Sequence, residues 1–154
     1  MVVSDMRRFC KYFCLIALVL YLLMIFIFSN QNGNSSAGLS HKITLIMTSF
    51  LFKQDSFYAC LIFDRLHYIT RKLAHFTEYF GLAILIFFNL KMWFKKQNAL
   101  WVTLLFALFV AFADEFHQFF ISERKANVFD VLIDFLGAFL GYMNSLFLDG
   151  DIND

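Results

Sequence analysis

Long apolar blocks alternate with short polar segments along the chain. Four blocks approach the length of a bilayer crossing, and they occupy residues 12–28, about 73–90, about 99–120 and about 129–148. A transmembrane helix needs about 20 mostly apolar residues. The polar segments 91–98 and 121–128 have eight residues each, and such short connections make neighbouring helices antiparallel. The pattern predicts an all-α polytopic membrane protein with a four-helix transmembrane bundle, in which residues 1–154 form a single domain.

The region between the first two predicted spans divides into three parts. Residues 29–42 are rich in Asn, Ser and Gly, a composition typical of a loop. Residues 43–52 are mostly apolar but too short to span, which indicates an interfacial or re-entrant segment. Residues 56–70 mix charged and aromatic side chains and predict an interfacial helix that leads into the second span.

The first apolar block has two interpretations. Small residues at Ser35, Ser36 and Ala37 would suit the cleavage of a signal peptide. The apolar run is longer than the usual core of a signal peptide, however, and these small residues lie well beyond its end. We therefore expect an uncleaved first span.

Composition narrows the class of protein. The 154 residues are 60% hydrophobic and 16% charged, which is more apolar than a soluble domain of this length. The formal net charge of +1 provides no basic surface for nucleic acid, so we expect no nucleic-acid partner. Three cysteines without regular spacing indicate neither a disulfide framework nor a metal motif.

Basic residues predict the orientation of the bundle. Lys and Arg residues near the spans number six on the side of the N-terminus and seven on the other, but the six lie in much shorter segments. Trp93 and Trp101 flank the short loop on the N-terminal side, as interfacial anchors do. We therefore expect both termini in the cytoplasm and the opposite ends of the helices outside.

Ionisable and amide side chains gather at one end of the predicted bundle. The second span begins, the third ends and the fourth begins on the same side of the membrane, so polar residues at these positions converge. They are Arg71, Lys72, His75, Glu78, Asp114, Glu115, Gln118, Arg124, Asp130 and Asp134. Because residues three and four positions apart share a helix face, each span carries them as a stripe. Gly137 and Gly141 continue the last stripe as a small-xxx-small pattern, which allows close helix packing.

These polar residues need compensation within a membrane. A charge there costs about 2.5–3.5 kcal/mol on insertion scales, so the residues must pair, bind a ligand or contact water. Mutual salt bridges that fix the bundle are one interpretation. Buried ion pairs stabilise less than apolar packing does, so we favour a functional site. His75 and Glu78, with the nearby carboxylates, make a divalent cation a candidate cofactor, although spacing alone defines no complete ligand set.

Several motifs resemble the VanZ-like family of membrane proteins. They are Arg71-Lys72-Leu73-Ala74-His75-Phe76-Thr77-Glu78-Tyr79, Asp114-Glu115-Phe116-His117-Gln118, the closing Arg124, Asp130, Asp134 and Gly137, and the polar segment Phe28-Ser29-Asn30-Gln31 with Ser35, Ser36 and Ser40. The resemblance covers nearly the whole chain. It implies a protein of the bacterial cell membrane and cell envelope. The founding member of the family is linked to low-level resistance to the glycopeptide teicoplanin.

A binding protein is the first functional hypothesis for the polar cluster. Its ligand would be an anionic membrane lipid or a lipid-linked cell-wall precursor, because guanidinium and ammonium groups bind phosphate. The ligand-binding residues would be Arg71, Lys72, Gln118, Arg124, Asp130 and Asp134. The sequence leaves the oligomeric state open.

An enzyme acting on a phosphorylated lipid is the alternative. His75 or Glu78 would act as general acid or base, and Asp114, Glu115 and Asp130 would orient groups or hold a cation. The arginines would stabilise the charge that develops on the phosphate. A transporter or proton pathway ranks last, because the charges stop at one end of the spans instead of crossing the membrane.

Overall fold

Five helices follow one another in the computed structural model, which describes residues 2–31, 33–51, 57–93, 96–121 and 127–153. They are α1 (Val2–Ser29), α2 (Gly33–Leu51), α3 (Phe57–Lys91), α4 (Lys96–Phe119) and α5 (Val128–Asn153). Four of them contain an apolar stretch long enough to cross a membrane: Arg8–Ser29, Ile62–Lys91, Ala99–Phe119 and Val128–Gly150. The predicted all-α fold with four spans is confirmed, and the chain is a multi-pass membrane protein.

Helix α2 corrects the prediction of a loop over residues 29–42, because the chain is helical from Gly33 onward. Hydroxyl groups of α2 bond within the helix: the Thr44 hydroxyl donates to the carbonyl oxygen of Ser40 at 2.8 Å, and that of Thr48 to the carbonyl oxygen of Thr44 at 2.9 Å. Helix α2 also packs against α3. This contact stabilises a helix in a segment whose composition favours a loop.

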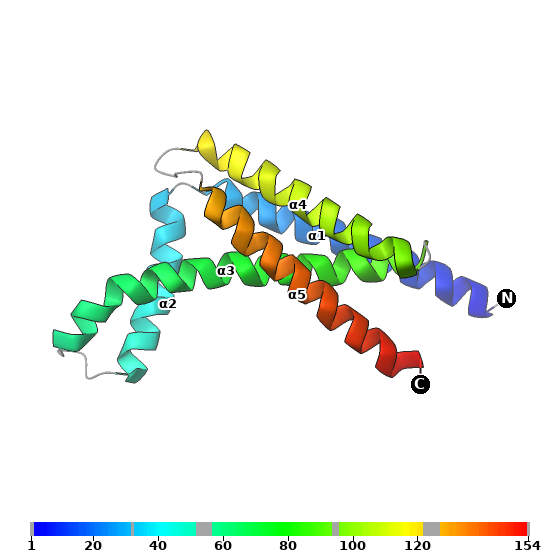
Figure 1. Cartoon of the computed structure of the whole chain (residues 1–154), viewed down its shortest axis with the longest axis horizontal. Helices are drawn as coiled ribbons and strands as arrows, with labels where there is room; N and C mark the ends of the chain where they lie inside the picture. Colours follow the sequence, from blue (N-terminus) through cyan, green and yellow to red (C-terminus); the bar gives the residue numbers. More distant parts are fainter. Residues whose placement is uncertain (1, 32, 52–56, 94–95, 122–126, 154) are drawn as a thin grey trace.

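Helix α3 joins two predicted elements into one. The helix expected over residues 56–70 and the second span form a continuous helix of 35 residues. Helix α2 crosses the N-terminal part of α3 (Figure 1), where Ser40 Oγ lies 2.7 Å from His67 Nε2 and Thr44 donates a 3.4 Å hydrogen bond to Thr70. The apolar residues 43–51 thus belong to a helix held against α3.

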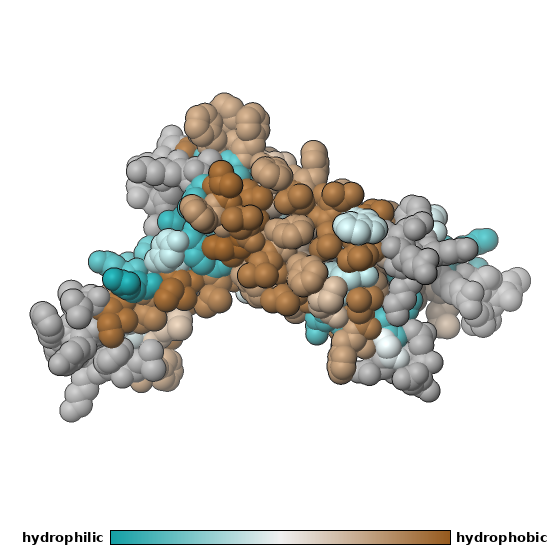
Figure 2. All heavy atoms as spheres, viewed as in Figure 1, coloured by the Kyte–Doolittle hydropathy of each residue, from teal (hydrophilic) through white to brown (hydrophobic). Residues whose placement is uncertain are grey.

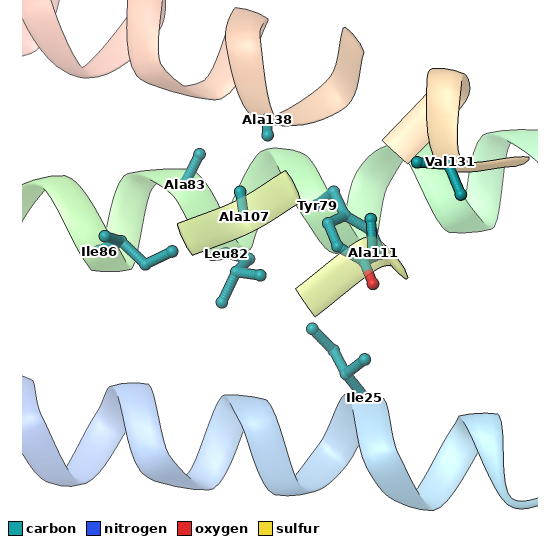
Figure 3. Packing of buried hydrophobic residues seen from close by; sticks show 9 residues of the cluster. All are labelled: Ile25, Tyr79, Leu82, Ala83, Ile86, Ala107, Ala111, Val131 and Ala138. Atoms are coloured by element: carbon teal, nitrogen blue, oxygen red, sulfur yellow. The ribbon is translucent and has the colours of Figure 1, made fainter. Parts of the chain in front are cut away.

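The apolar core centres on α3, which contacts each of the other four helices. Its buried residues meet residues of α1, α4 and α5 in one cluster (Figure 3). The members are Ile25, Tyr79, Leu82, Ala83, Ile86, Ala107, Ala111, Val131 and Ala138. Small alanines on three of the helices let their backbones approach, as in other membrane bundles.

Helix α5 packs closely against α3 at two glycines. A Cβ atom at Gly137 would overlap the carbonyl oxygen of Phe76, and one at Gly141 would overlap that of Phe80. The small-xxx-small pattern therefore faces the interior of the bundle and brings α5 onto the backbone of α3.

Two ion pairs, one toward each end of the contact, tie α3 to α5. Lys72 pairs with Asp130 and Lys91 with Asp149, and both pairs join residues 58 positions apart, so the two helices run parallel and in register. The α3 residues between Lys72 and Lys91 rise by about 28 Å at 1.5 Å per residue. This length is close to the roughly 30 Å of a bilayer hydrocarbon core. The spacing of the two pairs therefore matches the thickness of one membrane crossing.

Large apolar side chains cover the outside of the bundle between these pairs. Phe109 and Phe116 of α4 are each 69% exposed, and Leu132 of α5 is 58% exposed. Figure 2 shows hydrophobic residues over the centre of the molecule, with hydrophilic residues gathered toward the two sides. Both chain ends lie at the same end of the bundle (Figure 1), as the short predicted connections require.

The glycine contact leads to a prediction about stability. Gly141→Ala should lower the melting temperature of the purified protein, because an added Cβ forces the two backbones apart at a cost of about 1–3 kcal/mol. Gly38→Ala is the matched control, since nothing lies within 4 Å of a Cβ there. That change should keep or raise stability, because alanine favours a helix over glycine by about 1 kcal/mol. Equal behaviour of the two variants would contradict the packing described here.

Candidate functional site

A cavity of about 580 Å³ lies between α1, α2, α3 and α4 at the polar end of the bundle. Its wall combines apolar side chains, such as Met24, Ile43 and Met47, with a group of polar ones. The charged and amide side chains that line it include Arg71, His75, Glu78, Asp114 and Gln118. The structure therefore brings half of the ten predicted site residues into one cavity.

Helix α3 presents its polar stripe to this cavity. Arg71, His75 and Glu78 lie at spacings of four and three residues and so project from one face, as predicted. The neighbouring face carries Phe76 and Phe80, whose carbonyl oxygens lie under the glycines of α5. Packing of α5 on one face thus leaves the polar face for the cavity.

His75 lies between the cavity and the contact of α3 with α5. Its Nδ1 lies 3.4 Å from Oδ1 of Asp134, whose side chain is completely buried. This separation is within ion-pair distance but outside hydrogen-bond geometry, and neither oxygen of Asp134 has a hydrogen-bond partner among the described residues. A carboxylate on the Nδ1 side of the imidazole leaves Nε2 for proton transfer. The arrangement is therefore suited to a general acid or base at the cavity wall.

Helix α4 contributes Asp114 and Gln118 to the cavity. The Gln118 side chain donates a 2.6 Å hydrogen bond from Nε2 to Oδ2 of Asp114, one helical turn away. The adjacent Glu115 is 5% exposed and accepts a 2.8 Å hydrogen bond from the backbone N–H of Asn127. Glu115 therefore ties the end of α4 to the start of α5 and is not among the residues that line the cavity.

Three predicted binding residues lie outside the cavity wall. Lys72 and Asp130 pair with each other, and the Lys72 ammonium also lies 5.1 Å from the centre of the Tyr68 ring. Asp134 is buried behind His75. The structure places these three residues at the α3–α5 contact, where pairing and packing occupy them.

Arg124 and a divalent cation also belong to the predicted site. Arg124 lies outside the described residues, so its ligand-binding role stays a prediction. Among the described parts of the chain, no group of three or more His, Cys, Asp or Glu side chains is arranged to hold a metal ion.

The first two helices and the segment between them supply cavity residues that the sequence did not single out as ligands. Ser29, Gln31 and Ser40 line the cavity, and they belong to the polar segment that resembles the family. Tyr21 donates a 3.0 Å hydrogen bond to the backbone oxygen of Glu78, and Gly81 leaves room for its ring. In the sequence, the polar residues directly after the first apolar span could have indicated this part of the cavity wall.

The comparisons with known proteins assign a family. A family model described as VanZ/LLP1 matches residues 13–149, which extend from within α1 to within α5 and include the whole cavity wall. No significant match was found among curated proteins or among solved structures. Because the family model covers far more than half of the sequence, this chain belongs to the VanZ/LLP1 family.

Proposed function

We propose that the cavity binds the phosphorylated headgroup of a membrane lipid and that Arg71 contacts the phosphate. The guanidinium of Arg71 carries the proposal: it lines the cavity and, among the described residues, forms no ion pair with a carboxylate. Lys72 and Lys91, by contrast, are paired with aspartates of α5. A planar guanidinium binds phosphate through two parallel hydrogen bonds, which favours it as a headgroup ligand.

The apolar part of the cavity wall supports a lipid rather than a soluble phosphate. Met24, Ile43, Met47 and Leu73 offer hydrocarbon contacts beside the polar group, as ligand pockets do for the apolar part of a ligand. Arg71 adjoins Lys72, whose ion pair stands at one limit of the membrane crossing inferred above. A phosphate at this depth would belong to a headgroup, and the attached chains would extend along the apolar wall.

A lipid-linked cell-wall precursor is a second ligand with the same chemistry, because it also combines phosphate with a long hydrocarbon chain. The family resemblance supports this source, since it implies a role in the bacterial cell envelope and connects the family to teicoplanin-type glycopeptide resistance. In a bacterial host, this extension predicts that Arg71→Ala changes susceptibility to teicoplanin relative to the wild-type chain.

The proposal places the cavity on the outer side of the bacterial cell membrane and both termini in the cytoplasm. Dense basic residues near the opposite end of the bundle support this orientation. Lys91 lies there, and Lys11 sits 4.4 Å from the centre of the Trp93 ring, an arrangement typical of an interface.

Thiol labelling of intact cells tests this orientation. In a chain whose three cysteines are replaced by serine, Phe120→Cys should react with a membrane-impermeant maleimide, because Phe120 is 68% exposed at the cavity end. Gly150→Cys, at the other end, should react only after the cells are opened. The reverse pattern would place the cavity in the cytoplasm.

Lipid titration of the purified protein tests the binding proposal. Arg71→Ala should weaken the binding of a short-chain phospholipid by about 10-fold or more, since a hydrogen bond to a charged group contributes about 1.5–3 kcal/mol. Arg71→Lys should retain part of the affinity. Arg65→Ala is the matched control, because Arg65 is exposed on the same helix outside the cavity wall. Unchanged affinity in Arg71→Ala would refute the proposed role.

The contact between His75 and Asp134 favours a second candidate, an enzyme that hydrolyses a phosphorylated lipid. His75 would act as general base toward water, Asp134 would orient the imidazole, and Arg71 would stabilise the charge that develops on the phosphate. Glu78 and Asp114 line the same cavity and would position the water.

Phosphate release from a lipid diphosphate separates this enzyme from a binding protein. The wild-type chain should release phosphate, His75→Ala should lower the rate by about 100-fold or more, and His41→Ala should not change it, because His41 is exposed on α2 outside the cavity wall. If no phosphate is released with any of several divalent metals, the enzyme hypothesis fails while the binding proposal stands.

A further inference from the structure

The cavity wall carries both positive and negative side chains, which does not suit a ligand with negative charge alone. Among the described lining residues, two carboxylates, Glu78 and Asp114, accompany the single guanidinium of Arg71. His75 also lines the polar wall, and its Nδ1 lies 3.4 Å from the buried Asp134. A ligand with negative charge alone would therefore meet like charges in a half-buried space, which is unfavourable.

The α4 side of the cavity is a hydrogen-bond acceptor. Gln118 is only 5% exposed and uses its side-chain N–H₂ group to donate to Asp114 at 2.6 Å. The amide carbonyl of Gln118 and the carboxylate of Asp114 remain as acceptors, whereas the guanidinium of Arg71 on α3 can only donate. Arg71 of α3 thus offers donors to a ligand, and Asp114 and Gln118 of α4 offer acceptors.

From this division we infer that the ligand carries a primary amine beside its phosphate. The phosphate would contact Arg71, and the ammonium group would donate to Asp114. This inference rests on the proposed function and specifies its ligand class: a zwitterionic aminophospholipid headgroup, such as phosphoethanolamine.

The apolar part of the wall agrees with a lipid of this kind. The apolar residues Ile43 and Met47 of α2 would contact the acyl chains that leave the phosphate.

Competition among short-chain lipids tests the inference with the full-length protein. Phosphatidylethanolamine should bind at least about fivefold more tightly than phosphatidylglycerol, which has the same phosphate but no amine. N-acylated phosphatidylethanolamine, whose nitrogen carries no charge, should bind as weakly as phosphatidylglycerol. Asp114→Asn should remove the preference by weakening the first lipid and strengthening the second. Asp64→Asn is the control, because Asp64 is exposed on α3 outside the cavity wall.

The possible results distinguish the two proposals. Equal or tighter binding of phosphatidylglycerol that still depends on Arg71 would overturn the amine inference and leave the phosphate site intact. Loss of the dependence on Arg71 for both lipids would overturn the proposed function itself. The N-acylated lipid keeps the inference falsifiable even if Asp114→Asn fails to fold, since it needs only the wild-type chain.

Discussion

The close packing of α5 on the backbone of α3 is the constraint on which the rest of the bundle depends. Within a membrane, lipid chains are as apolar as the side chains, so helices associate through packing and polar contacts rather than through the hydrophobic effect. Gly137 and Gly141 allow that packing by leaving space for the carbonyl oxygens of Phe76 and Phe80. This contact fixes one face of α3 and thereby determines which of its polar residues reach the cavity.

Polar groups near the ends of the spans divide into two kinds because of this contact. Lys72 and Lys91 are neutralised by aspartates of α5, and such pairs hold the helices in register while lowering the cost of each charge. Arg71 instead lines a cavity whose described charged residues also include Glu78 and Asp114. A phosphate ligand can compensate the charge of Arg71. The packing of the bundle and the proposed function therefore both depend on α3.

Periodicity was sufficient to predict the spans and the polar stripes. Which polar residues form ion pairs and which line the cavity became clear only from the tertiary structure. Arg71 and Lys72 are adjacent in sequence, yet they project about 100° apart on a helix and meet different partners. One wall of the cavity also comes from α2, and the Asn, Ser and Gly content of residues 29–42 predicted a loop there. Glu115 likewise looked like a site residue, but it accepts a hydrogen bond from Asn127, a contact that spacing could not reveal.

An experimental structure of the protein in a lipid bilayer tests the central claim most directly. We predict density for a phosphorylated headgroup in the cavity, with a phosphate oxygen within about 3 Å of the Arg71 guanidinium. A cavity without a headgroup, or a headgroup bound elsewhere while Arg71 pairs with a carboxylate of the chain, would contradict it.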